Sequence, residues 1–482
     1  MSGIAGSDAV PDVSSVESAL DTIEHRGPEG TRVVTYNNAV LGQVWPESRD
    51  HMMEGEDETP VVLDGEIFNW YDIQPGATSP LEAITLAYAE HGPSFVDSLD
   101  GHFAIAIAGS DGVFLARDPV GVVPLYYSSN GSLAFASEVK AMQDLGETPT
   151  ELPPGHYLDP ADGLVQYAEI APVAPVDASA EELVAELRHV LVSAIAKRTA
   201  GGDLGSWLSG GVDSSVMATL ARRQLSELKS FAAGLEGAPD LKFARMVADH
   251  IGTDHRERVM TPGEMLRLLP DVIFHLESFD ALLVRSSITN FAVGELASEH
   301  VAAVLSGEGG DELFAGYSYL KCLPPEALSD ELVDITNRLH NTALQRVDRC
   351  SKAHGLIAHV PFLDQDVVSL ALSIPTRFKL NREAGMVEKW CLRRVVDGML
   401  PDEILSRPKA KFWEGAGVEE VLSDHAETAI TDSDFRAERT LPDGGSLNTK
   451  EELMYYRIFC EHFGEKGACE VVGRTKGAPV DN

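Results

Sequence analysis

The sequence predicts an α/β protein with two domains, and three observations support this. An apolar strand, a glycine turn and a helix follow one another between Ser206 and Arg222. Helices alternate with short apolar strands such as 230–235 and 301–305, a pattern typical of a parallel sheet covered by helices. Residues 60–140 are instead rich in short strands. At 482 residues the chain is too long for one ordinary core, so two domains are expected.

The composition limits the classes of partner. The chain has 76 acidic and 38 basic side chains, a net charge of -38, and a hydrophobic share of 44%. That share is enough for a folded core, so we interpret the acidity as a solvated surface, typical of proteins in very high salt. It argues against nucleic acid or an anionic membrane as a partner. Without a signal peptide or long apolar segment in this sequence, we expect a soluble, cytoplasmic protein.

The first half of the chain contains two hairpin signals. Asp111-Gly112 separates the apolar runs 103–108 and 113–115. Asn130-Gly131 separates the runs 125–127 and 133–136. An Asx-Gly pair between alternating apolar runs predicts a tight hairpin.

A change of composition marks the domain boundary. The Ala-Pro-Val repeat at 171–176 is typical of a linker. Ser179 and Glu182 have capping-box spacing ahead of an amphipathic run at 183–196, which predicts a helix start. We therefore expect domains at 1–170 and 179–482, joined by a linker at 171–178.

The glycine turn after 206–208 has the features of an anion site. Gly210 and Gly211 let backbone N–H groups approach a phosphate, and the following helix adds its positive end. Ser209, Ser214 and Ser215 add hydroxyl donors. Asp213 would repel a phosphate unless a cation lies between them, so it is interpreted as a Mg²⁺ ligand. The alternative is a serine-capped helix after a tight turn.

The full string from Ser209 to Ser215, Ser-Gly-Gly-Val-Asp-Ser-Ser, is more specific. It resembles the pyrophosphate-binding loop of the ATP pyrophosphatases, which split ATP into AMP and pyrophosphate. A P-loop is excluded because no Gly-Lys-Ser/Thr ending follows.

Further motifs resemble the asparagine synthetase family along nearly the whole chain. The glutaminase half of that family is matched, in order, at 1–4, 25–29, 64–69, 116–121 and 136–141. Its synthetase half is matched at 209–215, 239–242, 306–312, 360–364 and 407–412. The resemblance implies an N-terminal αββα sandwich of the Ntn, class II glutamine amidotransferase-like type. An α/β ATP pyrophosphatase domain with a parallel sheet would follow it.

The resemblance also implies that the glutaminase site is degenerate. The family's nucleophilic cysteine is replaced by Ser2, and no cysteine precedes Cys322. Its glutamine-clamping arginine falls at Trp45, its oxyanion-hole asparagine at Asp64, and an acidic residue that holds the glutamine amine near Pro80. An aspartate in an oxyanion hole opposes the charge it should stabilise. We expect glutamine to be useless as a nitrogen donor.

In the second domain the family's site residues are retained. The resemblance implies that Asp213 and Asp311 hold Mg²⁺, that Glu308 acts in acyl-adenylate formation, and that Lys409 meets the phosphates. The family's adenosine contacts fall at Leu208, Ala233, Ser306 and Gly307. Arg407 and Lys411 are interpreted as solvated surface charges.

The acid-binding segment is less well matched. Arg285 corresponds to an arginine whose planar fork suits a substrate carboxylate. Two threonines of the family are Leu282 and Leu283 here, and each lost hydroxyl contact is worth about 1 kcal/mol. Either aspartate is held differently, or the acid has more apolar surface.

The leading hypothesis is an ATP- and Mg²⁺-dependent amide ligase that joins aspartate to free ammonia. One alternative is a ligase for another acid and amine, like the β-lactam synthetases and lasso-peptide cyclases. Another is a catalytically silent binding protein, against which the retained metal and phosphate residues argue. The partners expected are small molecules, and the oligomeric state, including a homodimer, is left open by the sequence.

Overall fold

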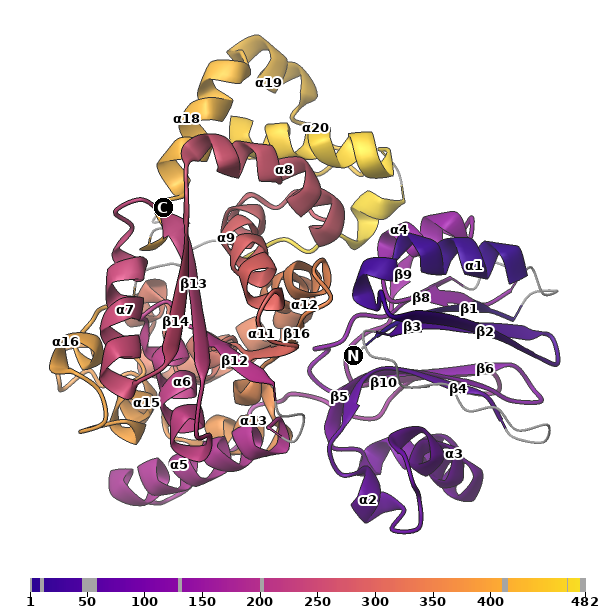
Figure 1. The fold of residues 1–482 in the computed structure, drawn as a ribbon, viewed down its shortest axis with the longest axis horizontal. Helices are drawn as coiled ribbons and strands as arrows, with labels where there is room; N and C mark the ends of the chain where they lie inside the picture. Colours follow the sequence, from indigo (N-terminus) through magenta and orange to yellow (C-terminus); the bar gives the residue numbers. More distant parts are fainter. Residues whose placement is uncertain are drawn as a thin grey trace. The chain divides into compact units, whose positions relative to one another are not determined.

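The computed structural model describes residues 2–8, 13–45, 59–128, 132–199, 203–409, 415–465 and 467–476. The chain divides into two compact units (Figure 1). The first contains residues 1–170, 352–355 and 460–472, and the second contains 171–351, 356–459 and 473–482. The sequence predicts a contiguous second domain over 179–482, whereas two short segments of that range group with the first unit.

Two antiparallel sheets form the middle of the first unit, with helices on their outer faces (Figure 1). One sheet has the order β2-β3-β1-β8-β7-β9 and the other β11-β10-β6-β5-β4. Helices α1 and α4 pack on the first sheet, and α3 packs on β4. The predicted αββα sandwich is confirmed. The elements are β1 (Gly3–Ser7), α1 (Val13–Thr22), β2 (Gly30–Tyr36), β3 (Ala39–Trp45), β4 (Val61–Ile67), α2 (Trp70–Ile73), α3 (Pro80–His91), β5 (Gly101–Ala108), β6 (Val113–Arg117), β7 (Tyr126–Ser128), β8 (Ala134–Ala136), α4 (Val139–Asp144), β9 (Thr150–Glu151), β10 (His156–Asp159) and β11 (Gly163–Gln166).

Strand β5 shows how the sequence builds this sandwich. All its residues are buried, and successive side chains point to opposite faces of the sheet. Ala104, Ala106 and Ala108 belong to one core cluster, together with residues of the other sheet such as Ile4 and Leu41. The larger side chains Phe103, Ile105 and Ile107 belong to a second cluster with residues of α3. Small residues thus face the space between the sheets.

The first predicted hairpin is confirmed. Strands β5 and β6 pair antiparallel, with Ala108 opposite Val113, and Gly112 in the connecting turn has a φ of 135°. Strands β7 and β8 also pair antiparallel. The second predicted turn, Asn130-Gly131, lies outside the described residues.

A parallel five-stranded sheet forms the centre of the second unit, as predicted. Its order is β14-β13-β12-β15-β16, and every pair in it is parallel. Helix α9 packs on β13 and β14, as does α7, while α6 packs on β12. The strands are β12 (Leu204–Trp207), β13 (Lys229–Leu235), β14 (Asp254–Met260), β15 (Ala303–Leu305) and β16 (Ile357–His359).

Helices make up most of the rest of the second unit. The predicted capping box of Ser179 and Glu182 is present at the start of α5. The helices are α5 (Ala180–Lys197), α6 (Val212–Gln224), α7 (Pro239–Ile251), α8 (Pro262–Leu276), α9 (Ala281–Ser298), α10 (Gly310–Leu313), α11 (Leu328–Asn337), α12 (Ala343–Lys352), α13 (Gln365–Ser373), α14 (Thr376–Lys379), α15 (Trp390–Val395), α16 (Asp402–Leu405), α18 (Glu419–Ala429), α19 (Asp432–Glu438) and α20 (Lys450–Phe463).

The strand order reverses at β12. The chain passes from β12 outward to β13 and β14, then returns to place β15 on the other side of β12. Parallel strands end at the same edge of a sheet, and ligands of open α/β sheets bind where the order reverses. The loops after β12 and β15 therefore mark the place to look for a site.

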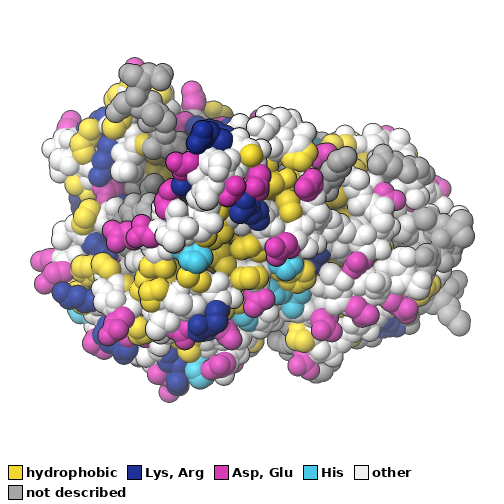
Figure 2. Space-filling view, turned by 90° about the horizontal axis from the view of Figure 1, so that it is seen from above, with side chains coloured by type: hydrophobic (Ala, Val, Ile, Leu, Met, Phe, Trp, Pro, Cys, Tyr) yellow, Lys and Arg dark blue, Asp and Glu magenta, His cyan; other side chains and the backbone are white. Residues whose placement is uncertain are grey.

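Acidic side chains are spread over the surface. On the face drawn in Figure 2, Asp and Glu lie among side chains of other kinds and do not form one continuous patch. This distribution agrees with the interpretation of the net charge as a solvated surface.

Candidate active site

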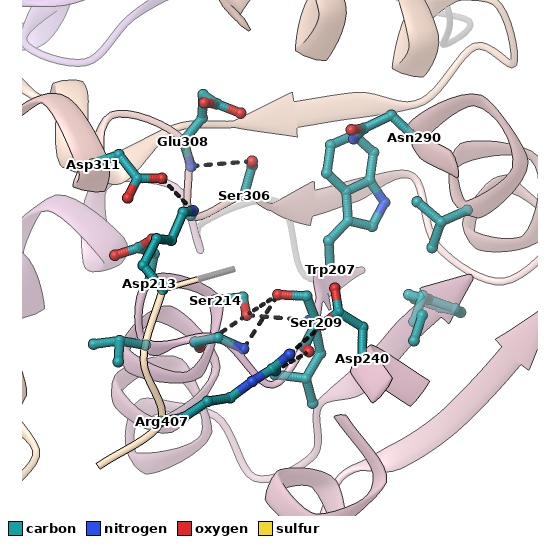
Figure 3. A pocket seen from close by; sticks show the side chains of 18 of the residues that line it. Trp207, Ser209, Asp213, Ser214, Asp240, Asn290, Ser306, Glu308, Asp311 and Arg407 are labelled. Carbon is teal, nitrogen blue, oxygen red and sulfur yellow. Dashed lines mark hydrogen bonds and ion pairs between the residues drawn. The ribbon is translucent and has the colours of Figure 1, made fainter. Parts of the chain in front are cut away.

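The loop after β12 forms one wall of a cavity of about 150 Å³ (Figure 3). Gly210 has a φ of 69°, and a Cβ atom there would lie 2.4 Å from Phe243. The backbone N–H of Ser209 donates to Ser214 Oγ at 3.1 Å, and that of Gly211 donates to Ser209 Oγ at 3.3 Å. The hydroxyls are thus held beside the start of α6, whose N-cap, Gly211, supplies no side-chain cap.

Not every predicted ATP-binding residue lines this cavity. Gly210 makes the turn, and Ser215 is fully buried in the first turn of α6. The cavity is lined by the other predicted ATP-binding residues, Leu208, Ser209, Gly211, Asp213, Ser214, Ala233, Ser306 and Gly307, and by Glu308, Asp311 and Lys409.

The loop after β15 forms the facing wall. A Cβ atom on Gly307 would lie 2.8 Å from the backbone nitrogen of Ser214, and one on Gly310 would lie 2.7 Å from Asp213 Oδ1. The two loops approach this closely only because these residues are glycines. The Glu308 N–H donates to Ser306 Oγ at 3.3 Å, which fixes the start of the loop.

Two carboxylates and two lysines meet between the loops. Lys389 Nζ lies 2.5 Å from Asp213 Oδ2 and 2.5 Å from Asp311 Oδ1. Lys409 Nζ donates to Asp311 Oδ2 at 2.5 Å. Each of these partly buried carboxylates therefore has a cationic partner, which offsets the cost of removing its charge from water.

The two carboxylates differ in their protonation equilibria. Burial raises the pKa of Asp213, although Lys389 opposes this rise. Burial also acts to raise the pKa of Asp311, but Lys389 and Lys409 together hold that pKa well below its usual range. Burial opposes the charged form of Lys409, yet Asp311 and Asp213 raise its pKa.

The carboxylates fit a divalent cation. Asp213 Oδ1 is buried and has no hydrogen-bond partner among the described residues. Those residues contain no cluster of three or more His, Cys, Asp or Glu side chains that could hold a metal ion by themselves. Mg²⁺ is commonly bound by one or two carboxylates together with substrate phosphates, so the pair suits a metal that arrives with a nucleotide.

Arg407 also lies in this cavity, and its prediction as a surface charge is wrong. Its side chain is 9% exposed and pairs with Asp240 at 2.5 Å. Its guanidinium donates to the Ser209 carbonyl at 3.2 Å and lies 4.1 Å from the centre of the Phe243 ring. These contacts fix the position of the glycine loop. Lys411 lies outside the described residues.

A second cavity of about 220 Å³ adjoins the first. Its lining includes the side chains Leu282, Leu283, Tyr317, Tyr319, Ile335 and Leu339. Glu308, Asp311, Arg346 and Lys409 line both cavities. Arg346 forms an ion pair with Glu308. The shared residues place Glu308 at the junction, where groups from the two cavities can meet.

Arg285 does not line either cavity. Its guanidinium forms a two-point ion pair with Glu451, with Nε 2.7 Å from Oε1 and Nη2 2.5 Å from Oε2. Glu451 also accepts a hydrogen bond from Tyr455 at 2.7 Å. The predicted carboxylate-binding arginine is therefore held by a carboxylate of this chain.

Ser2 and Asp64 lie together in the first unit, both buried. Ser2 Oγ donates to the Leu63 carbonyl at 2.6 Å, and Gln43 donates to Ser2 Oγ at 2.9 Å. The Ser2 backbone nitrogen donates to Asp64 Oδ1 at 3.0 Å. The hydroxyl is thus fully engaged by neighbouring groups.

Asp64 is the acceptor for several donors. Its Oδ2 accepts from Arg26 at 2.8 Å and from Ser137 at 3.0 Å. Arg26 also pairs with Glu138 at 2.8 Å. Arg26, Asp64 and Glu138 are fully buried and form an ionic network. Trp45 ends β3, and Pro80 begins α3 after the N-cap Ser79.

Comparison with known proteins identifies the family. The asparagine synthase family model matches residues 186–325 and 324–476, and the glutamine amidotransferase domain model matches residues 1–154. Glutamine-hydrolyzing asparagine synthetase 3 of Arabidopsis thaliana is 35% identical, over 92% of this chain and 84% of the relative. The chain belongs to the asparagine synthase family. The corresponding enzyme of Sandersonia aurantiaca is 34% identical, over 92% of this chain and 91% of the relative.

Membership of the asparagine synthase family settles the reaction class. The protein is an ATP-dependent carbon–nitrogen ligase that forms AMP and pyrophosphate. The names of the relatives and the glutamine amidotransferase match favour glutamine hydrolysis, so they do not support the expected independence from glutamine. Within the described residues, no helix has the length and apolar character needed to cross a membrane.

Proposed function

We propose that this asparagine synthase family member joins an acid, with aspartate as first choice, to free ammonia. The observation that carries the proposal is that the Ser209–Ser215 loop, which contains Asp213, meets Asp311 and two lysines in one cavity. That cavity adjoins a second one at Glu308. Such an arrangement suits a nucleotide on one side and an acid on the other.

The proposed reaction has two steps. An oxygen of the substrate carboxylate attacks the α-phosphorus of ATP, and the bond to pyrophosphate breaks. The amine nitrogen then attacks the acyl carbon, AMP leaves, and the amine loses a proton. Glu308 lies at the junction of the cavities, where a carboxylate can orient the amine and accept this proton. Arg346, paired with Glu308, would fix its orientation.

The phosphates would lie on the glycine loop and the start of α6. Free N–H groups and the positive end of a helix dipole favour an anion there. Lys389 and Lys409 lie opposite and can follow negative charge onto the leaving pyrophosphate. Asp213 and Asp311 would hold Mg²⁺, which would neutralise charge on the pyrophosphate.

Free ammonia is proposed as the donor because of the contacts of Ser2 and Asp64. The Ser2 hydroxyl is directed to the Leu63 carbonyl, and Asp64 presents a negative charge, already paired with Arg26, where the family has an oxyanion-hole asparagine. An oxyanion needs hydrogen-bond donors at that place. The network suits a structural role for this part of the first unit.

The apolar lining of the second cavity favours one alternative, a ligase for a different acid and amine. Leu282 and Leu283 both lie in that lining. A silent binding protein is a weaker alternative, because a buried cluster such as Asp213, Asp311 and Lys389 is costly to keep without a ligand.

The proposal is tested by pyrophosphate release from ATP and Mg²⁺ across a panel of acids and amines. We expect release with aspartate and ammonium, and none with Asp311→Asn, whose unfolding temperature should stay close to that of the wild type. Normal turnover by Asp311→Asn would show that the site is misassigned. A different preferred acid would establish the alternative ligase.

A further inference from the structure

The charged groups that line the second cavity differ in whether they also line the first cavity. One set, Glu308, Asp311, Arg346 and Lys409, also lines the first cavity and is partly buried, with side chains 12% to 24% exposed. Of the other charged groups in this lining, Glu312 is buried, whereas Arg338 and Lys476 are more exposed, with side chains 52% and 37% accessible. The lining therefore combines a partly buried set of mixed charge with two more exposed cations.

Acidic residues hold the exposed cations from outside the cavity. Arg338 pairs with Asp334 at 3.0 Å, one turn earlier on α11. Lys476 pairs with Asp334 and with Glu331, each at 2.8 Å. Among the described residues that line the cavity, Arg338 and Lys476 are present and these two carboxylates are not. Exposed ion pairs of this kind contribute little and rearrange easily.

The segment that carries Lys476 is fixed by Asp280. Thr475 donates to Asp280 through its backbone nitrogen at 3.1 Å and through its hydroxyl at 2.7 Å. Asp280 is also the N-cap of α9 and accepts from the Leu283 nitrogen at 2.9 Å. One carboxylate thus positions both the leucine wall and the lysine segment.

We propose that Arg338 and Lys476 bind the non-reacting carboxylate of the acid substrate. The inference rests on the proposed function, in which the reacting carboxyl lies beside Glu308. Where the second cavity meets the first, Arg346 and Lys409 are already paired with the carboxylates of Glu308 and Asp311, so their charges are neutralised within the protein. Among the described residues that line this cavity, only Arg338 and Lys476 are cations whose acidic partners lie outside the lining, and a guanidinium matches a carboxylate well.

The assignment also accounts for the position of Arg285. Because Glu451 holds that guanidinium, another cation must meet the non-reacting carboxylate of an acid such as aspartate. The leucines in the cavity wall do not conflict with this, since they would contact the carbon chain between the two carboxylates. Arg338 and Lys476 are thus specificity-determining residues.

The test compares Arg338→Ala and Lys476→Ala with two matched controls in the full-length protein. Lys450 bridges Glu427 and Asp432 as Lys476 bridges its two acids, and Arg457 pairs with Glu438. Neither control residue lines the cavity, so Lys450→Ala and Arg457→Ala should behave as wild type. The acids are aspartate and β-alanine, which is aspartate without its α-carboxylate.

We expect each cavity variant to raise the KM for aspartate about ten-fold, the usual size of a lost charge-assisted contact. The kcat value and the KM for ATP should stay unchanged. β-Alanine should be poor with the wild type and no poorer with the variants. Arg338→Lys should recover part of the loss.

An unchanged KM for aspartate, or an equal rise with β-alanine, would overturn the inference. Calorimetric titration of aspartate separates this result from failure of the proposed function. If no pyrophosphate is released, but aspartate binds and its binding depends on Arg338 and Lys476, the proposed function is refuted and the carboxylate site is upheld. If pyrophosphate is released, but replacing either residue leaves aspartate binding unchanged, the proposed function is upheld and the carboxylate site is refuted.

Discussion

The ammonium group of Lys389 lies 2.5 Å from Asp213 Oδ2. The lysine backbone has a φ of 55°, in the left-handed region, which costs about 1 kcal/mol or more for a residue with a side chain. The same ammonium reaches Asp311. The surrounding structure thus imposes a strained backbone that brings one cation to both carboxylates.

Removing this cation should impair turnover. Lys389→Met leaves Asp213 and Asp311 without their shared cation, so the site without ligand is destabilised and one contact to the phosphates is lost. We expect pyrophosphate release to fall by about 10²-fold, comparable to the loss of one preorganised electrostatic contact. Steady-state assays at saturating ATP measure this.

Lys321→Met is the matched control for that variant. Lys321 pairs with Glu388 at 2.7 Å and does not line either cavity. Its replacement should leave turnover near the wild-type rate. Equal losses in both variants would mean that Lys389 acts through stability and not through the site.

Restoring hydroxyls at the leucine wall tests the acid. Leu282 and Leu283 line the second cavity, and each new hydroxyl contact to a polar acid is worth about 1 kcal/mol. The double variant Leu282→Thr, Leu283→Thr should therefore lower the apparent KM for aspartate. The KM is measured alongside the unfolding temperature, because Leu283 is only 3% exposed. An unchanged aspartate KM, with another acid preferred by both proteins, would favour the alternative ligase.

The sequence predicts the part of the site that lies on loops after strands. Asp213 and Asp311 follow two strands that turn out to be neighbours in a parallel sheet, and the carboxyl ends of such strands share one edge. The glycine and hydroxyl motif around Asp213 predicts its role, whereas the role of Asp311 is implied by the family resemblance. The αββα layers of the first unit are implied by the family resemblance, and the parallel sheet of the second unit is predicted from the alternation of helices with short apolar strands.

Single charges far along the chain could not be placed in the same way. Lys389 and Arg346 lie in no motif, and Arg407 looks like any surface arginine until its ion pair with Asp240 is seen, 167 residues away. Arg285 matches a family position, yet Glu451, 166 residues later, holds it. Such partners depend on tertiary packing, which periodicity and spacing do not encode.

A buried lysine should make stability depend on pH. Lys379, at the end of α14, is 2% exposed, and burial lowers its pKa from 10.5 to about 8. The folded protein then binds fewer protons than the unfolded chain between these values, so the free energy of unfolding should rise with pH from about 8 to 10.5,. Its contribution is present above 10.5 and lost as the pH falls through 8.

Lys379→Met should remove this dependence. The variant should gain stability over the wild type at pH 7, where the wild type must keep a buried charge, and the difference should shrink toward pH 10.5. Thermal unfolding of both proteins at a series of pH values measures it. A constant difference at all pH values would contradict the buried charge and point to packing alone.

The contacts of Ser2 and Asp64 determine which nitrogen donor we expect the protein to use. The Ser2 hydroxyl is engaged with the Leu63 carbonyl and with Gln43. Asp64 offers acceptors, paired with Arg26 and Ser137, where an oxyanion needs donors. Loss of one oxyanion donor typically costs about 10²–10³ in rate, so glutamine should give no product while ammonium supports the reaction.

Ser2→Cys should not restore glutaminase activity. The thiol would supply a nucleophile, but Trp45 would still stand where the family has its glutamine-clamping arginine, and Asp64 would still oppose an oxyanion. The measurement compares glutamate released from glutamine with pyrophosphate released from ATP, for the wild type and the variant. Glutamate formed by the wild type at the rate of ATP turnover would mean that Ser2 is a working nucleophile, as the glutamine-hydrolysing relatives suggest.

Asp64→Asn should lower the free energy of unfolding by about 3 kcal/mol, because breaking a buried pair leaves the Arg26 charge without one of its partners.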